Sequence, residues 1–289
     1  MSPHLPRVVL YHQTHHFPNT TSEVPLSPLV HSLPSDLHPH VVVILAAVHL
    51  NTSPTPHLTL NDDLPAHPKF SSLFACLEEL RENGITVTCM LGGAAQGSFR
   101  VLDVTNPEWE VYYQLLAQFL RDYAMSGIDL DVEEEMSLAG IVRIIRRLRA
   151  DFGPEFIITL APVATALQPG FRHLSGFSYF ALEQEVGSEV AWYNTQFYCG
   201  WGDLRDPAAW ARILGAGWDP RKVVVGTVTN PANAGGYVET AAVAEMLGRL
   251  KSLGVGGVAG WEFWNALPGG EEDAWMWCLE MAAGLGLLE

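Results

Sequence analysis

Short apolar runs typical of strands alternate with stretches of helical spacing along the whole chain, and no linker interrupts them. The expected strands are Arg7–Tyr11, His40–His49, Ile85–Leu91, Gly127–Glu133, Phe156–Ala161, Trp192–Tyr198, Lys222–Thr229 and Gly257–Phe263. Such alternation indicates parallel strands joined by right-handed crossovers. A doubly wound open sheet is an alternative, but no G-x-G-x-x-G motif follows the first strand. The pattern therefore predicts the α/β class and a closed (β/α)8 TIM barrel.

The stretches between the strands carry N-terminal helix signals. Asn106 is a candidate N-cap, with Pro107 at the first helical position. Ser137 is a candidate N-cap for a helix with a buried stripe of Leu138, Ile141, Ile145 and Leu148. By contrast, residues 50–69 contain four prolines and two asparagines. They are expected to form a long loop beyond the second strand, on the side where barrel enzymes build substrate clefts.

Length and charge limit the classes of protein that this chain represents. Its 289 residues fit one barrel, so residues 1–289 are expected to form a single domain. The net charge of −16 argues against nucleic acid or an anionic membrane as a partner. No apolar run approaches the length of a membrane span. We expect a monomer that is either intracellular or secreted with its leader removed, since residues 1–7 lack a signal-peptide core.

Cysteine usage gives no sign of a metal centre. Cys76, Cys89, Cys199 and Cys278 are widely scattered and lack the spacing of metal ligands. Cys89 lies in an apolar strand and is expected to be a buried thiol. No cofactor is expected.

The strand Gly127–Glu133 places its acidic residues on one face. Asp129, Asp131 and Glu133 alternate with apolar residues, so neighbouring carboxylates lie about 7 Å apart. Each ionised carboxylate raises the pKa of the next, which favours a proton held near neutral pH and hence acid–base chemistry. A solvated strand face and a Mg²⁺ or Ca²⁺ site are the alternatives.

Other predicted strands also end in polar or aromatic residues. Candidate binding residues at these ends are Tyr11, Gly92, Gly93, Asn194, Gln196, Asn230 and Trp261, with Tyr198 as a further candidate for chemistry. The carboxyl ends of barrel strands meet at one mouth. Aromatic planes and a few hydrogen-bonding groups suit the apolar face and the hydroxyl edges of a sugar ring. The sequence therefore predicts a carbohydrate cleft.

The acidic strand also resembles a family signature. Ser126-x-x-Asp129-x-Asp131-x-Glu133 is similar to the D-x-x-D-x-D-x-E motif of glycoside hydrolase family 18, the chitinases and endo-β-N-acetylglucosaminidases. Residues 91–93 resemble the family's S-x-G-G, residues 196–198 resemble its Q-F-Y, and Tyr11 and Trp261 match its aromatic positions. The resemblance covers nearly the whole chain and is nearest to the single-domain plant and fungal type. Ser126 departs from the motif, at the position farthest from the expected cleft.

The resemblance implies a retaining reaction assisted by the substrate, because no second carboxylate is evident across the cleft. Glu133 would donate a proton to the glycosidic oxygen, and Asp131 would orient the acetamido group. Asp129 would share a proton with Asp131. Tyr198 would bind the acetamido oxygen, and Trp261 would form the floor of the subsite.

Several functions stay open at this point. The implied substrate is an N-acetylglucosamine saccharide, either chitin or the chitobiose core of an N-glycan, and cleft length and loop shape decide between them. A non-catalytic carbohydrate-binding protein of the same family is an alternative, although Glu133 is present. A metal-dependent hydrolase is another, which EDTA sensitivity would reveal.

Overall fold

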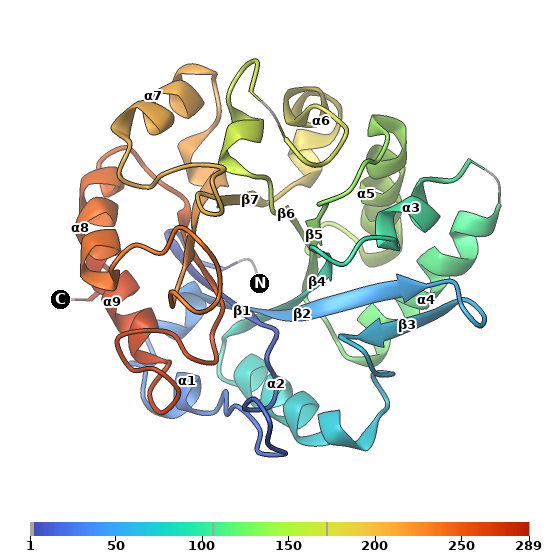
Figure 1. Cartoon of the computed structure of the whole chain (residues 1–289), viewed down its shortest axis with the longest axis horizontal. Helices are drawn as coiled ribbons and strands as arrows, with labels where there is room; N and C mark the ends of the chain where they lie inside the picture. The colour runs from blue at the N-terminus through green and yellow to red at the C-terminus, as the bar shows by residue number, and fades with distance from the viewer. Residues whose placement is uncertain (1–2, 106, 172, 289) are drawn as a thin grey trace.

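The strands form a ring with helices outside it (Figure 1). The computed structural model describes residues 3–105, 107–171 and 173–288. In this part of the chain the ring strands are β1 (Arg7–His12), β2 (Val41–Asn51), β4 (Thr86–Gly92), β5 (Gly127–Asp131), β6 (Ile157–Leu160), β7 (Trp192–Gln196), β8 (Val223–Val228) and β9 (Gly257–Trp261). Each pairs in parallel with its neighbours, and the pairing of β1 with β2 closes the sheet. The predicted (β/α)8 barrel is confirmed.

The helices of the described residues cover the outside of this ring. They are α1 (Pro28–His31), α2 (Ser71–Glu82), α3 (Ser98–Asp103), α4 (Glu108–Asp122), α5 (Leu138–Phe152), α6 (Tyr179–Val186), α7 (Pro207–Gly215), α8 (Thr240–Lys251) and α9 (Met276–Leu285). Ser137 caps α5 as predicted, accepting a hydrogen bond from the Gly140 amide. Pro107 is the N-cap of α4, whereas the expected cap Asn106 lies outside the described residues. None of the described helices is long and apolar enough to cross a bilayer.

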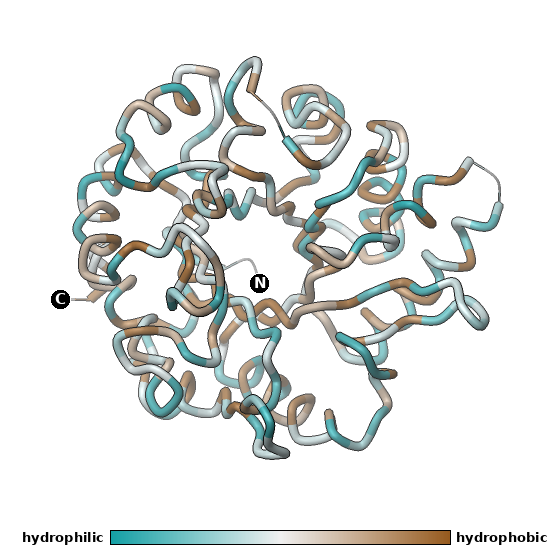
Figure 2. The backbone as a smooth tube through the Cα atoms, viewed as in Figure 1, coloured by the Kyte–Doolittle hydropathy of each residue, from teal (hydrophilic) through white to brown (hydrophobic). Residues whose placement is uncertain are grey.

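Alternation along the strands produces two apolar layers. Val8 and Leu10 of β1 pack between the strands and the helices, whereas Val9 and Tyr11 belong to a smaller cluster inside the barrel. Figure 2 shows the resulting concentration of hydrophobic residues along the strands. In β5 the apolar residues lie in the outer layer, so the acidic side chains face the lumen.

The segment after the second strand corrects the expectation of a loop over residues 50–69. It contains β3 (His57–Leu60), which pairs antiparallel with the end of β2, and a short 3₁₀ helix at Pro68–Phe70. The register of β2 shifts between Leu45 and Val48, which is where β2 leaves the ring. The β2–β3 hairpin therefore projects outward beside the barrel mouth (Figure 1).

Three of the predicted strands extend two residues beyond the observed strands at their carboxyl ends, and all three lie at the site. β5 ends at Asp131, β7 at Gln196 and β9 at Trp261. Glu133 and Tyr198 consequently belong to the first residues of the loops at the mouth, where the strand ladder no longer pairs the backbone.

Candidate active site

Asp129 is the deepest acid of the row and is completely buried. Its carboxylate accepts hydrogen bonds from the Tyr11 hydroxyl at 2.8 Å, the Thr159 hydroxyl at 2.5 Å and the Asn194 amide at 3.0 Å. Burial raises the pKa of Asp129, and these three bonds oppose the rise because they favour the charged form. Neutral donors from β1, β6 and β7 thus solvate this carboxylate inside the barrel.

Gln196 joins the other two acids. Its Nε2 lies 3.1 Å from Asp131 Oδ1, 3.2 Å from Glu133 Oε1 and 2.9 Å from the Ala161 carbonyl oxygen. An amide nitrogen carries two hydrogens, so one of them points at the carbonyl and the two carboxylates share the other. Gln196 therefore holds Asp131 and Glu133 side by side.

This pair is the site of the raised pKa values. Burial, and then the charges of Glu133 and Asp129, raise the pKa of Asp131 well above its ordinary value. Burial also raises the pKa of Glu133. The hydrogen bond from Gln196 opposes both shifts. The pair is therefore set up to hold a proton at a pH where exposed carboxyls are ionised.

Two glycines bring the loop after β4 against Asp131. Gly92 and Gly93 have φ of +96° and +84°, in the left-handed region that favours glycine. A Cβ on Gly92 would lie 2.4 Å from the ring of Phe99 and 2.6 Å from the Asp131 carbonyl oxygen. The Gly93 amide donates a hydrogen bond of 2.9 Å to that same oxygen. Both glycines line the cleft that opens above Asp131.

The cleft at the barrel mouth has a volume of about 370 Å³. Asp131 and Glu133 are the only carboxylates among the described residues that line it, and Tyr198, Trp201 and Trp261 supply aromatic surface. Burial, followed by the charges of Asp131 and Glu133, raises the pKa of Tyr198 well above its ordinary value. The phenol therefore stays protonated and is able to donate a hydrogen bond beside the acids.

The remaining predicted residues occupy different levels. Tyr11 and Asn194 lie below the cleft, where each donates to Asp129. Asn230 is not among the described residues that line the cleft. Its amide donates to the Asn265 carbonyl at 2.8 Å and accepts from the Ala232 amide at 2.9 Å. Its expected contact with substrate stays a prediction, since its polar atoms are used within the loop.

Ser126 lies at the opposite end of β5 from the cleft. Its backbone amide donates to the Val87 carbonyl, and its carbonyl accepts from the Ile157 amide. At the rise of an extended strand, Ser126 and Glu133 are on the order of 20 Å apart. The position that departs from the family motif therefore does not contact the acid pair.

Two buried acids near the mouth were missed in the sequence. Glu262 accepts hydrogen bonds from the Gln13 amide at 3.1 Å and from the Thr14 amide and hydroxyl at 2.8 Å each. Glu134 accepts from the amides of Gly97 and Phe99 at the start of α3, both at 2.9 Å. Glu262 directly follows Trp261, and Glu134 directly follows Glu133. Their position next to predicted site residues at strand ends is the sequence signal that could have identified them. Both fix loops of the mouth rather than line the cleft.

The described part of the chain contains neither a cluster of metal-binding side chains nor a disulfide bond. No group of three or more His, Cys, Asp or Glu side chains there is placed to hold a metal ion. The four cysteines are free, and Cys89 is buried as expected. The acids of β5 make their close contacts with neutral hydrogen-bond donors.

Comparison with known proteins agrees with this geometry. A solved fungal endo-β-N-acetylglucosaminidase from glycosyl hydrolase family 18 is 39% identical, with a TM-score of 0.91, and 98% of this chain and 99% of that chain are covered. Chitinase ChiC from Aspergillus fumigatus is 47% identical, with a TM-score of 0.85, over 96% of this chain and 99% of that one. Chitinase ChiA of Flavobacterium johnsoniae is 25% identical over 144 residues, 42% of this chain but only 9% of that protein. No protein-family model matches the sequence.

The barrel and the carboxylates at its mouth define the class, that of the (β/α)8 glycoside hydrolases. Identity above 30% to two solved members over almost the full chain narrows the class further. The chain belongs to glycoside hydrolase family 18.

Proposed function

We propose that this protein hydrolyses β-1,4 bonds at N-acetylglucosamine with retention of configuration, using the substrate's own acetamido group as nucleophile. Two family members with related activities support the proposal, a chitinase and an endo-β-N-acetylglucosaminidase. The substrate is an N-acetylglucosamine saccharide, and the protein acts as a monomeric single domain without a cofactor.

The observation that carries the proposal is the composition of the cleft. Glu133 and Asp131 are the only carboxylates among its described lining residues, and they are neighbours bridged by Gln196. A two-carboxylate mechanism needs its second acid across the sugar from the first. With both acids on one side, the nucleophile comes from the substrate.

The chemical steps follow from the positions of the side chains. Protonated Glu133 donates to the glycosidic oxygen while the acetamido oxygen attacks the anomeric carbon and forms an oxazolinium-like intermediate. Asp131 orients the acetamido nitrogen, and the protonated Tyr198 donates to the acetamido oxygen. The Trp261 indole supports the sugar ring. Glu133 then removes a proton from the water that opens the intermediate.

Replacing Glu133 tests the acid. Glu133→Gln keeps the shape and the ability to accept from Gln196 but has no proton to donate. We expect kcat on a chromogenic chitobioside to fall at least about 10²-fold, the lower range for general acid catalysis.

Glu135→Gln is the matched control because Glu135 is an exposed neighbour on the same loop. It should retain wild-type turnover, with both variants folded by circular dichroism. Undiminished turnover in Glu133→Gln would remove Glu133 from the mechanism. A wild type that binds chitobiose but hydrolyses no substrate would instead support a carbohydrate-binding protein.

A further inference from the structure

Strand β7 carries a row of buried side chains that point into the lumen at three levels. At the mouth, Gln196 contacts the acid pair, and one level down Asn194 contacts Asp129. Trp192 lies deeper still, within the cluster of buried residues inside the barrel, and its side chain is 1% exposed. An indole therefore lies directly below the amide that contacts the deepest acid.

This indole fixes the orientation of the Asn194 amide. The Nε1–H of Trp192 donates to Asn194 Oδ1 at 2.9 Å, and Asn194 Nδ2 donates to Asp129 Oδ1 at 3.0 Å. An indole nitrogen is only a donor. The reverse orientation of the amide would therefore set two donors against each other on one side and two acceptors on the other. The NH₂ group is thereby held toward the carboxylate.

Asn194 differs from the other two hydrogen-bond partners of Asp129. Tyr11 and Thr159 contact the carboxylate through hydroxyl groups, which are able to rotate and to accept a hydrogen bond from a protonated acid. The NH₂ group held by the indole is only able to donate. It therefore favours the ionised form of Asp129 at a position where burial acts against the charge.

A cation supports the indole at the N-terminal end of the barrel. The guanidinium carbon of Arg7 lies 4.3 Å from the centroid of the Trp192 ring, and Arg7 Nη1 donates to two backbone carbonyls. Burial lowers the pKa of Arg7 to about 10, which leaves it charged at neutral pH. A positive charge over the ring polarises the indole and makes its N–H a stronger donor.

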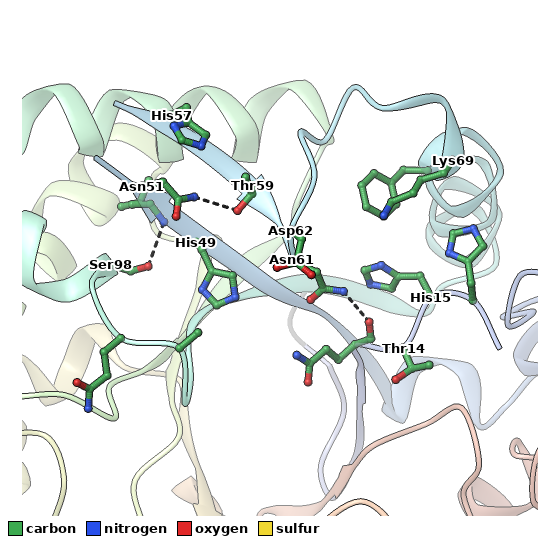
Figure 3. Close-up of a pocket in the computed structure, with 16 residues that line it drawn as sticks. Thr14, His15, His49, Asn51, His57, Thr59, Asn61, Asp62, Lys69 and Ser98 are labelled. Carbon is green, nitrogen blue, oxygen red and sulfur yellow. Dashed lines mark hydrogen bonds between the residues drawn. The ribbon is translucent and has the colours of Figure 1, made fainter. Parts of the chain in front are cut away.

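The other titratable side chains that surround Asp129 and the acid pair are uncharged near neutral pH. Burial raises the pKa values of one thiol and three phenols, those of Cys89, Tyr11, Tyr179 and Tyr198. His49 on β2 lies at the mouth beside the β2–β3 hairpin (Figure 3), and burial lowers its pKa. Strands β6, β8 and β9 contain no titratable residue. The charge of Asp129 therefore acts mainly on the acid pair, where it raises the pKa of Asp131.

We propose that Trp192 is a positioning residue of the active site: by fixing the Asn194 amide it keeps Asp129 ionised, and so leaves the catalytic proton with the acid pair above. The inference rests on the proposed function. Trp192 is not among the described residues that line the cleft, so it acts through Asn194 and not on the sugar. If Asp129 took up a proton, the repulsion that keeps the pair protonated would weaken.

Trp192→Phe tests the indole N–H, because it removes the donor and retains an aromatic ring next to Arg7. The Asn194 amide is then free to turn its oxygen toward Asp129, which favours the protonated form of that acid. The acid pair should lose its proton at lower pH. We expect the alkaline limb of the kcat/KM profile on the chitobioside to move down by about half a pH unit or more. KM below that limb should change less than about twofold, since the cleft is untouched.

Trp210→Phe is the matched control. Trp210 is a buried indole on α7 whose Nε1 has no hydrogen-bond partner among the described residues, and its ring stacks on Phe197 of the loop after β7. The substitution removes the same atoms from a packed site without removing a hydrogen bond, so the limb should stay in place. An equal movement in both variants would trace the effect to lost packing and overturn the proposal.

A double-mutant cycle tests whether Trp192 acts through Asn194. Asn194→Ala alone should move the alkaline limb down, because Asp129 loses the same donor. Trp192→Phe in the Asn194→Ala background should move it no further. Additive shifts would show that the indole acts on the acids by another route, which contradicts the proposal.

Nuclear magnetic resonance separates this inference from the proposed function. If the wild type cleaves no substrate, the proposed function fails, and the side-chain carboxyl carbon of Glu133 is titrated instead in protein labelled with isotopic glutamate. A lower midpoint in Trp192→Phe than in the wild type would support the role of Trp192. Equal midpoints would overturn it.

The wild type alone decides the question if Trp192→Phe does not fold. In protein labelled with isotopic tryptophan, the Nε1–H signal of Trp192 should shift with the same midpoint as the Glu133 carboxyl, because Asn194 and Asp129 connect the indole to the acid pair. A signal that stays constant through that titration would rule out the connection.

Discussion

At the scale of single residues, the site is a set of acids whose neighbours decide where the proton is held. Asp129 has three neutral donors, whereas Asp131 and Glu133 share one hydrogen of Gln196. Burial and mutual charge act most strongly on Asp131. The expected proton exchange between Asp129 and Asp131 stays a prediction; the contacts point to Asp131 and Glu133 as the coupled pair.

Gln196 should control the pH dependence of turnover. Its hydrogen bond favours the charged carboxylates and lowers the pKa of Glu133. In Gln196→Met that stabilisation is lost, so the pKa of Glu133 rises and the acid stays protonated to higher pH. The alkaline limb of the kcat/KM profile on the chitobioside should therefore move upward.

The kcat of Gln196→Met should fall by less than the roughly 10²-fold that we expect when the acid Glu133 is itself replaced. Gln118→Met, on the exposed face of α4, serves as the control and should leave the profile in place. A profile that moves to lower pH would show that Gln196 does not act on Glu133 in this way.

At the scale of elements, buried acids connect the loops that form the mouth. Glu262 follows β9 and binds the loop after β1, which supplies Gln13 to the cleft. Glu134 does the same for the loop between β4 and α3. The strand ends alone do not fix these loops, because the sheet ladder stops at the mouth.

Removing Glu262 should destabilise the protein. In Glu262→Ala the amides of Gln13 and Thr14 lose their acceptor, at an expected cost of about 2 kcal/mol in free energy of unfolding. Glu262→Gln retains an oxygen for the two amides, and its NH₂ group is able to donate to the Thr14 hydroxyl.

Chemical denaturation compares the two variants with Glu272→Ala, an exposed control in the loop between β9 and α9. We expect Glu262→Gln to recover most of the stability that Glu262→Ala loses. Equal losses in both would mean that the negative charge, and not the accepted hydrogen bonds, holds the loop.

At the scale of the whole molecule, the acid pair makes stability depend on pH. A carboxyl whose pKa is raised in the folded state disfavours folding wherever it is forced to ionise. That penalty is fully present above the folded pKa of Asp131 and disappears as the pH falls toward the unfolded value near 4. The free energy of unfolding should gain a contribution from this group as the pH is lowered from 8.

Asp131→Asn isolates the contribution. The variant should have a higher Tm than the wild type at pH 8, and the difference should shrink at pH 5, because the raised pKa of the wild-type carboxyl favours its protonated form as the pH falls. Asp122→Asn is the control, since Asp122 is exposed on α4. A variant less stable than the wild type at pH 8 would contradict the raised pKa.

Most of the fold could be predicted because its signals are local. Alternation with a period of two separates residues that face the lumen from residues that pack against the helices. In β5, Asp129 and Asp131 face the lumen, whereas Ile128 and Leu130 pack in the outer layer. The β2–β3 hairpin was missed although His57-Leu58-Thr59-Leu60 also alternates. The surrounding prolines favoured a loop there, and only pairing with β2 stabilises so short a strand.

The sequence by itself determined the barrel, the lumen-facing acids and the aromatic residues near the mouth, because these depend on order and alternation along the chain. Only the tertiary structure decided which atoms meet: Gln196 between Asp131 and Glu133, Glu262 against Thr14, and the hairpin beside the cleft. Glu262 and Thr14, for example, are 248 positions apart in the sequence. Such contacts depend on barrel closure and register, which no local pattern specifies.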